Sequence, residues 1–474
     1  MIELPKAKSI VFWFILLCGV VGTIELMALA AYRISFNEAF SYHKLQTLRH
    51  AAHEMVRSEF PFVIHPYYGY VFDPRLGGAN KDGFFGRENN IQPADPNKAV
   101  IAIIGGSMAA HFASDDRARE ALASDLKTIE AFQHRDIVVL NLANLAYKEP
   151  QGLLVINDIL SRGGRVDLVI ALDGFNEIAL PEAFGNVGNG ISPFYPMQWW
   201  RFSMESTLEA RAWLASIFSK PILRYSITAN FIWRVADGYF AKFDVNAGRP
   251  ADPGTRLSND RRIFLGPRTE YTTRRDLYMD IAVQWGRSSV LLKNIMAAQG
   301  GFYFHFLQPN QYVPGSKLLT EDESEAAINR ASRFKGPVEI GYPYLRAMGE
   351  SLQKAGVWFE DLSATFADVH QQVYIDKCCH VNTEGNAILA KAIAMAIATR
   401  LSNPADSANV PLAFDQVDFG SSLFASSRLR RFAPNSPDYR AGSSDTIEPF
   451  NNEQGMETRL SASKSSLRGA SSDP

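Results

Sequence analysis

A single serine follows a strongly apolar run and two glycines. The run over 99–105 is rich in valine and isoleucine, which predicts a buried strand, and Gly105 and Gly106 allow a sharp turn after it. The residues after Ser107 can open a helix, whose N-terminal N–H groups would stabilise negative charge near the hydroxyl. Ser107 is therefore a candidate nucleophile, although a glycine pair that ends a strand is also an ordinary turn.

Three further polar turns follow expected elements of the same kind. The second expected strand is followed by small residues that include Ala146, the third by Asn176, and the last expected helix is preceded by Asp376 and His380. A serine hydroxyl is too weak an acid to attack an ester unaided, so a histidine must take its proton and a carboxylate must orient that histidine. Backbone N–H groups and a side-chain amide can stabilise the oxyanion that forms.

Each of these residues also has an ordinary structural interpretation. A histidine such as His380 can be a surface hydrogen-bonding group, and Asn176 can cap the helix that follows it. His111 lies one turn after Ser107 and either faces the cleft or only supports it. Gln308 and Asn310 follow the fourth expected strand and either line the pocket or close a loop.

Together the four turns resemble the conserved blocks of the SGNH/GDSL family of serine hydrolases and acyltransferases. The resemblance covers about residues 98–180 and 300–400, and it extends to the Asn-x-x-Gly-Phe loop at 80–84, which precedes the first strand in many membrane-attached members. It implies a three-layer α/β/α, flavodoxin-like fold with a parallel sheet.

The resemblance also implies a role for each site residue. Ser107 is the expected nucleophile, His380 the expected base and Asp376 the carboxylate partner of that base. The expected oxyanion donors are the backbone N–H groups of Ser107 and Ala146 and the side-chain amide of Asn176.

Three positions depart from the family pattern. Gly106 stands where an aspartate is common, and Ala146 stands where a glycine is usual. Asp376 lies four residues before His380 instead of three, and Lys377 occupies the usual place of the carboxylate. Unless a bulged loop brings Asp376 to the imidazole, the site would work as a serine–histidine pair oriented by a backbone carbonyl.

The elements that must position these residues alternate in the manner of an α/β protein. Apolar strands separated by helical stretches predict a parallel sheet with helices on both faces. Strands are expected at 99–105, 136–142, 166–172, 301–307 and 357–361, and helices near 115–131, 150–161, 273–299, 343–355 and 384–400.

The chain divides into successive regions by composition. We expect a cytoplasmic N-terminus at 1–8, a transmembrane anchor at 9–32, a stalk and loop region at 33–97, a hydrolase-like domain at 98–401 with a helical cap insertion at 180–270, and a disordered tail at 402–474. The cap is rich in aromatic residues. This composition favours packing on the sheet over the alternative, a surface that contacts membrane or glycan.

The apolar segment 9–32 is long enough to cross a bilayer. Lys6 and Lys8 precede it, which favours a cytoplasmic N-terminus and a periplasmic domain on the bacterial cytoplasmic membrane. The alternative is a cleavable signal, since Ala28-Leu29-Ala30 resembles a cleavage site and Glu25 interrupts the apolar run.

Charge and cysteine content exclude other classes of protein. A net charge of −2 over 474 residues gives no basic footprint for nucleic acid. The 3 cysteines cannot make a disulfide framework, and Cys378 and Cys379 lack the spacing of metal ligands, so we expect packing roles for them, no metal and no cofactor. A nucleotide-binding domain is disfavoured because the chain has neither Gly-x-Gly-x-x-Gly nor Gly-Lys-Ser/Thr.

The sequence thus predicts a membrane-anchored serine esterase that forms an acyl-serine intermediate. Its expected substrates are O-acyl esters of envelope or extracellular carbohydrate. Two alternatives remain, namely an O-acyltransferase that uses the same site and an inactive glycan-binding or scaffold module of an envelope protein complex.

Overall fold

The computed structural model describes most of the chain outside its C-terminal region. The described residues are 7–59, 61–86, 88–183, 187, 190–197, 210–248, 269–402, 412, 417 and 419. They fall into two compact units: Met1–Pro61 joins Trp200–Ala251 in the first, and Phe62–Trp199 joins Asp252–Phe450 in the second.

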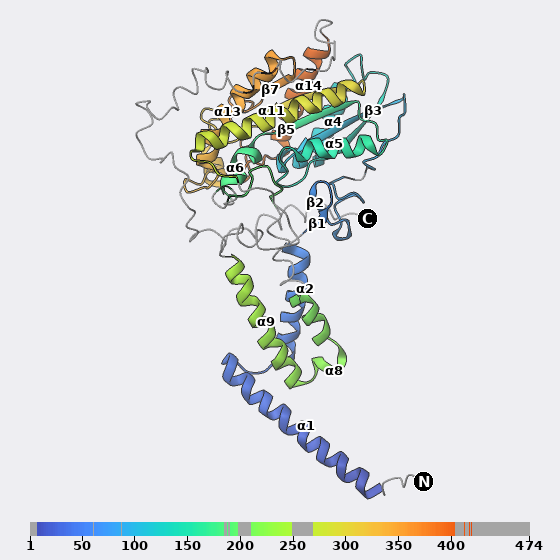
Figure 1. The fold of residues 1–474 in the computed structure, drawn as a ribbon, viewed down its shortest axis with the longest axis vertical. Helices are drawn as coiled ribbons and strands as arrows, with labels where there is room; N and C mark the ends of the chain where they lie inside the picture. Colours follow the sequence, from blue (N-terminus) through green and yellow to red (C-terminus); the bar gives the residue numbers. More distant parts are fainter. Residues whose placement is uncertain are drawn as a thin grey trace. The chain divides into compact units, whose positions relative to one another are not determined.

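The second unit is built on a parallel sheet (Figure 1). The sheet has 5 strands in the order β4-β3-β5-β6-β7, which is the 2-1-3-4-5 order of doubly wound sheets. The strands are β3 (Lys98–Gly105), β4 (Asp136–Asn141), β5 (Leu168–Asp173), β6 (Phe302–Leu307) and β7 (Trp358–Asp361). Every adjacent pair is parallel, so the α/β class and the parallel sheet predicted from the sequence are confirmed.

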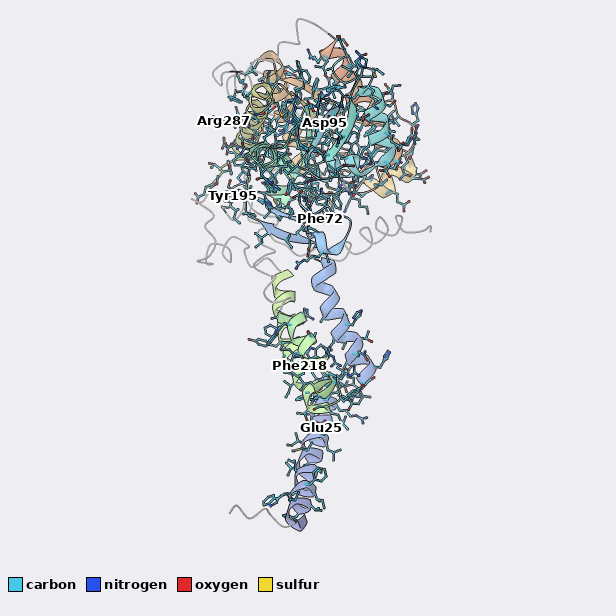
Figure 2. The ribbon with its side chains drawn as sticks, turned by 90° about the vertical axis from the view of Figure 1, so that its right-hand side faces the viewer. Glu25, Phe72, Asp95, Tyr195, Phe218 and Arg287 are labelled. Atoms are coloured by element: carbon cyan, nitrogen blue, oxygen red, sulfur yellow. The ribbon has the colours of Figure 1, made fainter. Side chains whose placement is uncertain are left out.

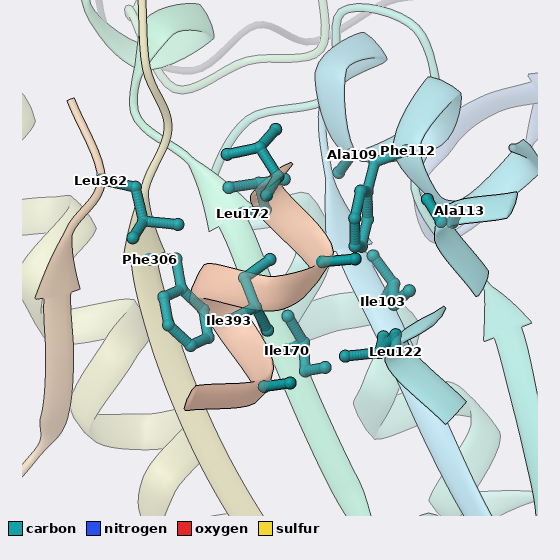
Figure 3. Packing of buried hydrophobic residues seen from close by; sticks show 14 of the residues in the cluster. Ile103, Ala109, Phe112, Ala113, Leu122, Ile170, Leu172, Phe306, Leu362 and Ile393 are labelled. Atoms are coloured by element: carbon teal, nitrogen blue, oxygen red, sulfur yellow. The ribbon is translucent and has the colours of Figure 1, made fainter. Parts of the chain in front are cut away.

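Helices cover both faces of this sheet. On one face α4 (Asp116–Leu126) packs along α14 (Thr383–Leu401) next to α3 (Ser107–Ser114). Figure 3 shows Ile103 and Ile170 of neighbouring strands meeting helix residues of this layer in the core.

Four described helices of the unit lie on the opposite face. These are α5 (Gln151–Ser161), α6 (Phe175–Ala183), α11 (Arg274–Ala298) and α13 (Lys335–Lys354). The alternation of side chains along β3 serves both layers, because Ile103 belongs to the first core and Ile104 points toward Gly152 of α5.

A short antiparallel hairpin precedes the sheet and supports one of its loops. It pairs β1 (Phe62–His65) with β2 (Gly69–Phe72) and is followed by the 3-10 helix η1 (Pro74–Leu76). The Tyr70 hydroxyl donates to the carbonyl of Leu145 at 2.7 Å, and the Tyr147 hydroxyl donates to the carbonyl of Tyr70. These two hydrogen bonds join the hairpin, which lies in the predicted stalk and loop region at 33–97, to the turn that follows β4.

The larger described part of the predicted cap groups with the N-terminal segment. This part, from 210 to 248, belongs to the first unit, together with α1 (Ala7–Phe36) and α2 (Tyr42–Glu59). That part contains a helix over 210–218, α8 (Pro221–Arg224) and α9 (Ile227–Gly248). Within this unit the aromatic side chains pack against the N-terminal segment, since Trp233 is buried with Tyr32 and Leu45. Most of the remaining cap lies outside the described residues.

Two described residues of the predicted disordered tail contact α11. Leu412 exchanges two hydrogen bonds with Asn294 of α11, and the Phe419 ring lies 5.6 Å from the Arg287 guanidinium on the same helix. The rest of 402–474 lies outside the described residues.

One helix among the described residues is long and apolar enough to cross a membrane. It is the stretch Ile10–Phe36 of α1, with a mean hydropathy of 2.3 over its most apolar part. The helix continues beyond the predicted boundary at residue 32.

Candidate active site

Ser107 is placed at the carboxyl edge of the sheet by two glycines. β3 ends at Gly105, whose φ of +138° and close approach to the Leu172 carbonyl (2.2 Å from an added Cβ) both require glycine. Gly106 is the N-cap of α3, and Ser107 begins that helix with 9% of its surface exposed. The predicted strand, turn and helix around the candidate nucleophile are therefore confirmed.

Gly106 is required for a different reason from Gly105. An added Cβ at Gly106 would lie 1.9 Å from Nδ2 of Asn176 and 3.1 Å from the carbonyl oxygen of Tyr147. The Asn176 amide also donates to the Tyr147 carbonyl at 2.7 Å. Three segments that follow β3, β4 and β5 thus meet beside Ser107, and the missing side chain at Gly106 gives the amide its space.

Ala146 adopts the backbone conformation that glycine favours. Its φ is +61°, in the left-handed region that L-residues enter at a cost of about 1 kcal/mol. The turn after β4 therefore has the shape expected where the family resemblance places a glycine, and it tolerates a Cβ.

Asp376 reaches His380 despite the unusual spacing. Tyr374 and Val381 form an isolated β-bridge, and the N–H of Ile375 donates to the His380 carbonyl at 3.0 Å. The segment 374–381, which we call the histidine loop, is thereby closed into a bulge that places Oδ2 of Asp376 2.5 Å from Nδ1 of His380. Lys377, which occupies the usual carboxylate position, contributes no carboxylate and is exposed.

The second carboxylate oxygen of Asp376 organises the loop backbone. Oδ1 accepts N–H groups from Cys378 at 2.9 Å, Cys379 at 3.0 Å and His380 at 3.2 Å. Burial alone would raise the pKa of Asp376, but the His380 ring and these N–H groups lower it to about 2. Burial lowers the pKa of His380, but the hydrogen bond and charge of Asp376 outweigh that effect and raise it above its usual value.

The histidine ring lies against the helix that begins at Ser107. It stacks on His111 with ring centroids 4.4 Å apart, one turn after Ser107 on α3. Burial, with the neighbouring His380, lowers the pKa of His111 to about 4, so this ring stays neutral near neutral pH. His111 therefore lies in contact with the candidate base His380.

Ser107 and His380 are not hydrogen-bonded to each other in this structure. Nε2 of His380 is buried and has no partner among the described residues, and the Ser107 hydroxyl interacts with the Cys379 thiol. Cys379 is itself buried, with its sulfur 3.2 Å from that of Cys378. The packing role predicted for Cys379 is confirmed, but its contact with Ser107 was not predicted.

Side chains of the segment after β6 donate hydrogen bonds to carbonyl groups of the histidine loop. Asn310 donates to the Cys378 carbonyl at 3.0 Å, Gln311 donates to the Asp376 carbonyl at 2.9 Å, and the Tyr312 hydroxyl donates to the Lys377 carbonyl at 3.0 Å. Asn310 therefore closes a loop, which was one of its two predicted roles. Gln311 and Tyr312 were missed because nothing in their spacing identifies the carbonyls they bind.

Gln308 differs from its neighbours. It is 1% exposed, and its Nε2 has no hydrogen-bond partner among the described residues. The structure gives this amide no loop-closing bond.

A buried ion pair supports the start of the histidine loop. Oε1 of Glu323, on α12 (Glu321–Ala327), accepts the N–H groups of Val373 at 2.9 Å and Tyr374 at 2.8 Å. The other oxygen lies 3.2 Å from Nζ of Lys317, and both side chains are fully buried. Sequence reasoning missed this pair because both residues lie in a charged stretch that has the composition of a surface.

A second group of buried carboxylates ties together the turns after β4 and β5. Glu177, next to Asn176, accepts the N–H of Glu149 at one oxygen and the N–H of Gly174 at the other, both at 2.9 Å. Burial and the nearby Asp173 raise the pKa of Glu177 to about 8, and burial raises the pKa of Glu149 well above its usual value.

Asp173 completes this group at the end of β5. It accepts the Trp285 indole N–H at 2.7 Å and lies 2.9 Å from Nε2 of His305. Burial lowers the pKa of Lys148, next to Glu149 in the chain, to about 7 in spite of the charge of Glu177. These acids fix the turns that carry Ala146 and Asn176 without touching Ser107.

Within the described part of the chain, no cluster of three or more His, Cys, Asp or Glu side chains could hold a metal ion. No protein-family model matches the chain, and no curated protein is significantly similar to it. The functional interpretation therefore depends on the geometry of the site.

Proposed function

We propose that this chain is a membrane-anchored serine hydrolase of the SGNH type, with a flavodoxin-like α/β/α fold and an acyl-serine intermediate. The observation that carries the proposal is the Asp376–His380 pair, closed at 2.5 Å and packed through His111 against the helix that begins at Ser107. The side-chain amide of Asn176 beside Gly106 supports it from the other side of the site.

The first half-reaction uses His380 as general base. Its Nδ1–H is held by Asp376, so Nε2 carries the lone pair that removes the proton from the Ser107 hydroxyl. The serine oxygen then bonds to the ester carbon, the bond to the leaving alcohol breaks, and His380 returns the proton to that alcohol. To begin this step, the Ser107 hydroxyl rotates from Cys379 toward Nε2, because catalytic hydrogen bonds often form only with substrate.

The charge that develops on the carbonyl oxygen is met by preorganised donors. In the proposal these are the N–H groups of Ser107 and Ala146 and the amide of Asn176, which the Tyr147 carbonyl already orients. The N-terminus of α3 adds its dipole at the same place.

The second half-reaction determines the class of product. Water attacking the acyl-serine completes ester hydrolysis, whereas a sugar hydroxyl completes acyl transfer, and in both cases His380 takes the proton of the attacking group and returns it to Ser107. We favour hydrolysis of O-acyl esters on envelope or extracellular carbohydrate, because the apolar helix α1 would hold the enzyme at the outer face of a bacterial cytoplasmic membrane.

One observation favours the inactive alternative. Nε2 of His380 has no hydrogen-bond partner among the residues that the structure describes, and a glycan-binding or scaffold module would not need one. The experiment must therefore report on activation of the serine itself.

The test is labelling of the full chain in detergent with a fluorophosphonate probe, in parallel with turnover of p-nitrophenyl acetate. Ser107→Ala and His380→Ala should abolish both signals, while the surface controls Ser161→Ala and His134→Ala should retain them. Because the pKa of His380 is raised and the base must be neutral, labelling should increase with pH above about 6.5. A folded wild-type chain that takes up no label would refute the hydrolase proposal and support the inactive module.

A further inference from the structure

The first unit contains a polar contact in the middle of an apolar helix. Glu25 lies within the apolar stretch of α1, and its carboxylate accepts the Ser226 hydroxyl at 2.7 Å and the N–H groups of Ile227 at 2.5 Å and Thr228 at 3.2 Å. The acid thus caps the N-terminus of α9, and Figure 2 labels it in this helical unit. Carboxylates near apolar membrane segments need such a partner, and here the partner comes from 200 residues later in the chain.

Beyond Glu25 the two helices run side by side away from this contact. The rings of Phe36 and Phe231 lie 6.3 Å apart, and the Arg234 guanidinium lies 5.2 Å from the Phe36 ring. Tyr32 is fully buried at the same interface. One face of the last part of α1 is therefore covered by protein.

The uncovered part of α1 is too short to cross a bilayer before it meets α9. The stretch Ile10–Ile24 rises roughly 22 Å at 1.5 Å per residue, whereas the hydrocarbon core is about 30 Å thick. The hydrocarbon must therefore extend past Glu25, where Leu26 and Met27 are 68% and 60% exposed while Ala28 is buried. Lipid and the start of α9 then surround the same turns of α1.

The segment that precedes α9 has the composition of a membrane interface. The segment 220–225, which we call the interfacial turn, contains α8 and places Ile222 86% exposed and Tyr225 61% exposed. Lys220 is exposed at its start, and the Arg224 guanidinium lies 4.5 Å from the Tyr225 ring. Exposed tyrosine and basic residues next to an apolar side chain are typical of the boundary between headgroups and hydrocarbon.

We propose that the interfacial turn contacts the outer leaflet of the membrane that α1 spans, with Ile222 at the hydrocarbon boundary and Lys220 among anionic headgroups. The partner is the lipid bilayer, because the turn leads directly into the residues that cap Glu25 at that depth. The chain is thus held by two contacts with one leaflet, which fixes the rotation of α1 about its axis. The inference rests on the proposed membrane insertion of α1 and is independent of the catalytic proposal.

The test uses the full chain in phosphatidylcholine–phosphatidylglycerol vesicles, with the three native cysteines replaced by serine. A single cysteine at Ile222→Cys carries the fluorophore NBD, and Val20→Cys and Tyr239→Cys are the matched positions. Val20 lies in the apolar part of α1, and Tyr239, 59% exposed, lies further along α9. We expect emission at 222 to be shifted to the blue and quenched by brominated lipid chains, emission at 20 to be quenched more strongly, and emission at 239 to resemble that in water.

Three outcomes would overturn the proposal. Water-like emission at 222 with quenching at 20 would show that α1 inserts but the interfacial turn stays in solvent. Water-like emission at 20 would show that α1 does not insert, and the turn would then have no membrane to contact. A blue shift at 222 without quenching by brominated lipid would show that protein, such as a second copy of the chain, covers Ile222.

Discussion

The histidine loop and the turns after β4 and β5 are both fixed by carboxylates, but these carboxylates meet different charges. In the histidine loop Asp376 faces His380, and Glu323 faces Lys317. In the β4 and β5 turns Glu149 and Glu177 face other acids, and Lys148 lies near Glu177. One side of the site, the histidine loop, thus favours an ionised Asp376, whereas on the other side, the β4 and β5 turns, burial among acids favours the protonated forms of Glu149 and Glu177.

The two sides therefore respond to pH in opposite directions. Asp376 has a pKa of about 2 against an ordinary value of 3.8, so its contribution to stability is present above pH 3.8 and is lost as pH falls through 2. Glu177 has a raised pKa of about 8, so its contribution is present below pH 4.5 and is lost as pH rises toward 8.

The largest effect is expected when the carboxylate charge of the histidine loop is removed. Asp376→Asn removes the charge that orients and activates His380, and we expect fluorophosphonate labelling to slow by about 10³–10⁴-fold. The exposed control Asp368→Asn should leave the rate unchanged. A labelling rate in the Asp376 variant that equals the wild-type rate would mean that the pair takes no part in catalysis.

The next largest effect is expected from the side-chain amide of Asn176, which the β4 and β5 turns position. Asn176→Ala should slow turnover of p-nitrophenyl acetate by about 10²–10³-fold. Gly106→Ala should cause a similar loss, because its Cβ would displace the Asn176 amide. If both act through that amide, the double variant should be no slower than either single one, whereas multiplied losses would show that they act separately.

A smaller effect is expected when one of the carboxyl groups with a raised pKa is replaced. Glu149→Gln removes a carboxyl whose pKa is well above its ordinary value, while the amide can still accept the Leu153 N–H. The variant should flatten the fall in Tm between pH 5 and 8 and raise Tm at pH 8 by roughly 2–4 °C. The exposed control Glu130→Gln should keep the wild-type slope, and an equally steep slope in the Glu149 variant would assign the pH dependence to other groups.

The smallest effect concerns the backbone of the β4 turn. Ala146→Gly relieves the left-handed conformation of Ala146, which outweighs the entropy that glycine adds to the unfolded chain, so we expect about 0.5–1 kcal/mol of stabilisation. Ala123→Gly in α4 should instead destabilise by about 1 kcal/mol. Chemical denaturation in detergent measures both changes, and equal signs would exclude strain at Ala146.

The sheet and its edge could be predicted because their signals are local. The apolar strands, the glycines before Ser107 and the polar residues after each strand all lie within a few positions of one another. The positions of Asn176 and His380 next to α3 then follow from the rule that strand ends of a parallel sheet share one edge.

The remaining features depend on contacts between distant segments. The histidine loop that joins Asp376 to His380 is held by Asn310 and Gln311 from the segment after β6, and no spacing rule contains those bonds. The cap was expected on the sheet because aromatic composition does not identify a packing partner. In the structure α9 packs against α1, and Glu25 of α1 caps the N-terminus of α9. The need for glycine at 106 likewise arises from Asn176 of α6, not from the local turn.

The ion pair between Lys317 and Glu323 makes the site's histidine depend on a stretch of chain some 50 residues earlier. Protein engineers who graft this edge of the sheet onto another scaffold would have to transfer α12 with it, since Val373 and Tyr374 would otherwise lose the acceptor for their N–H groups. A recombination point between the two segments would likewise separate His380 from this support.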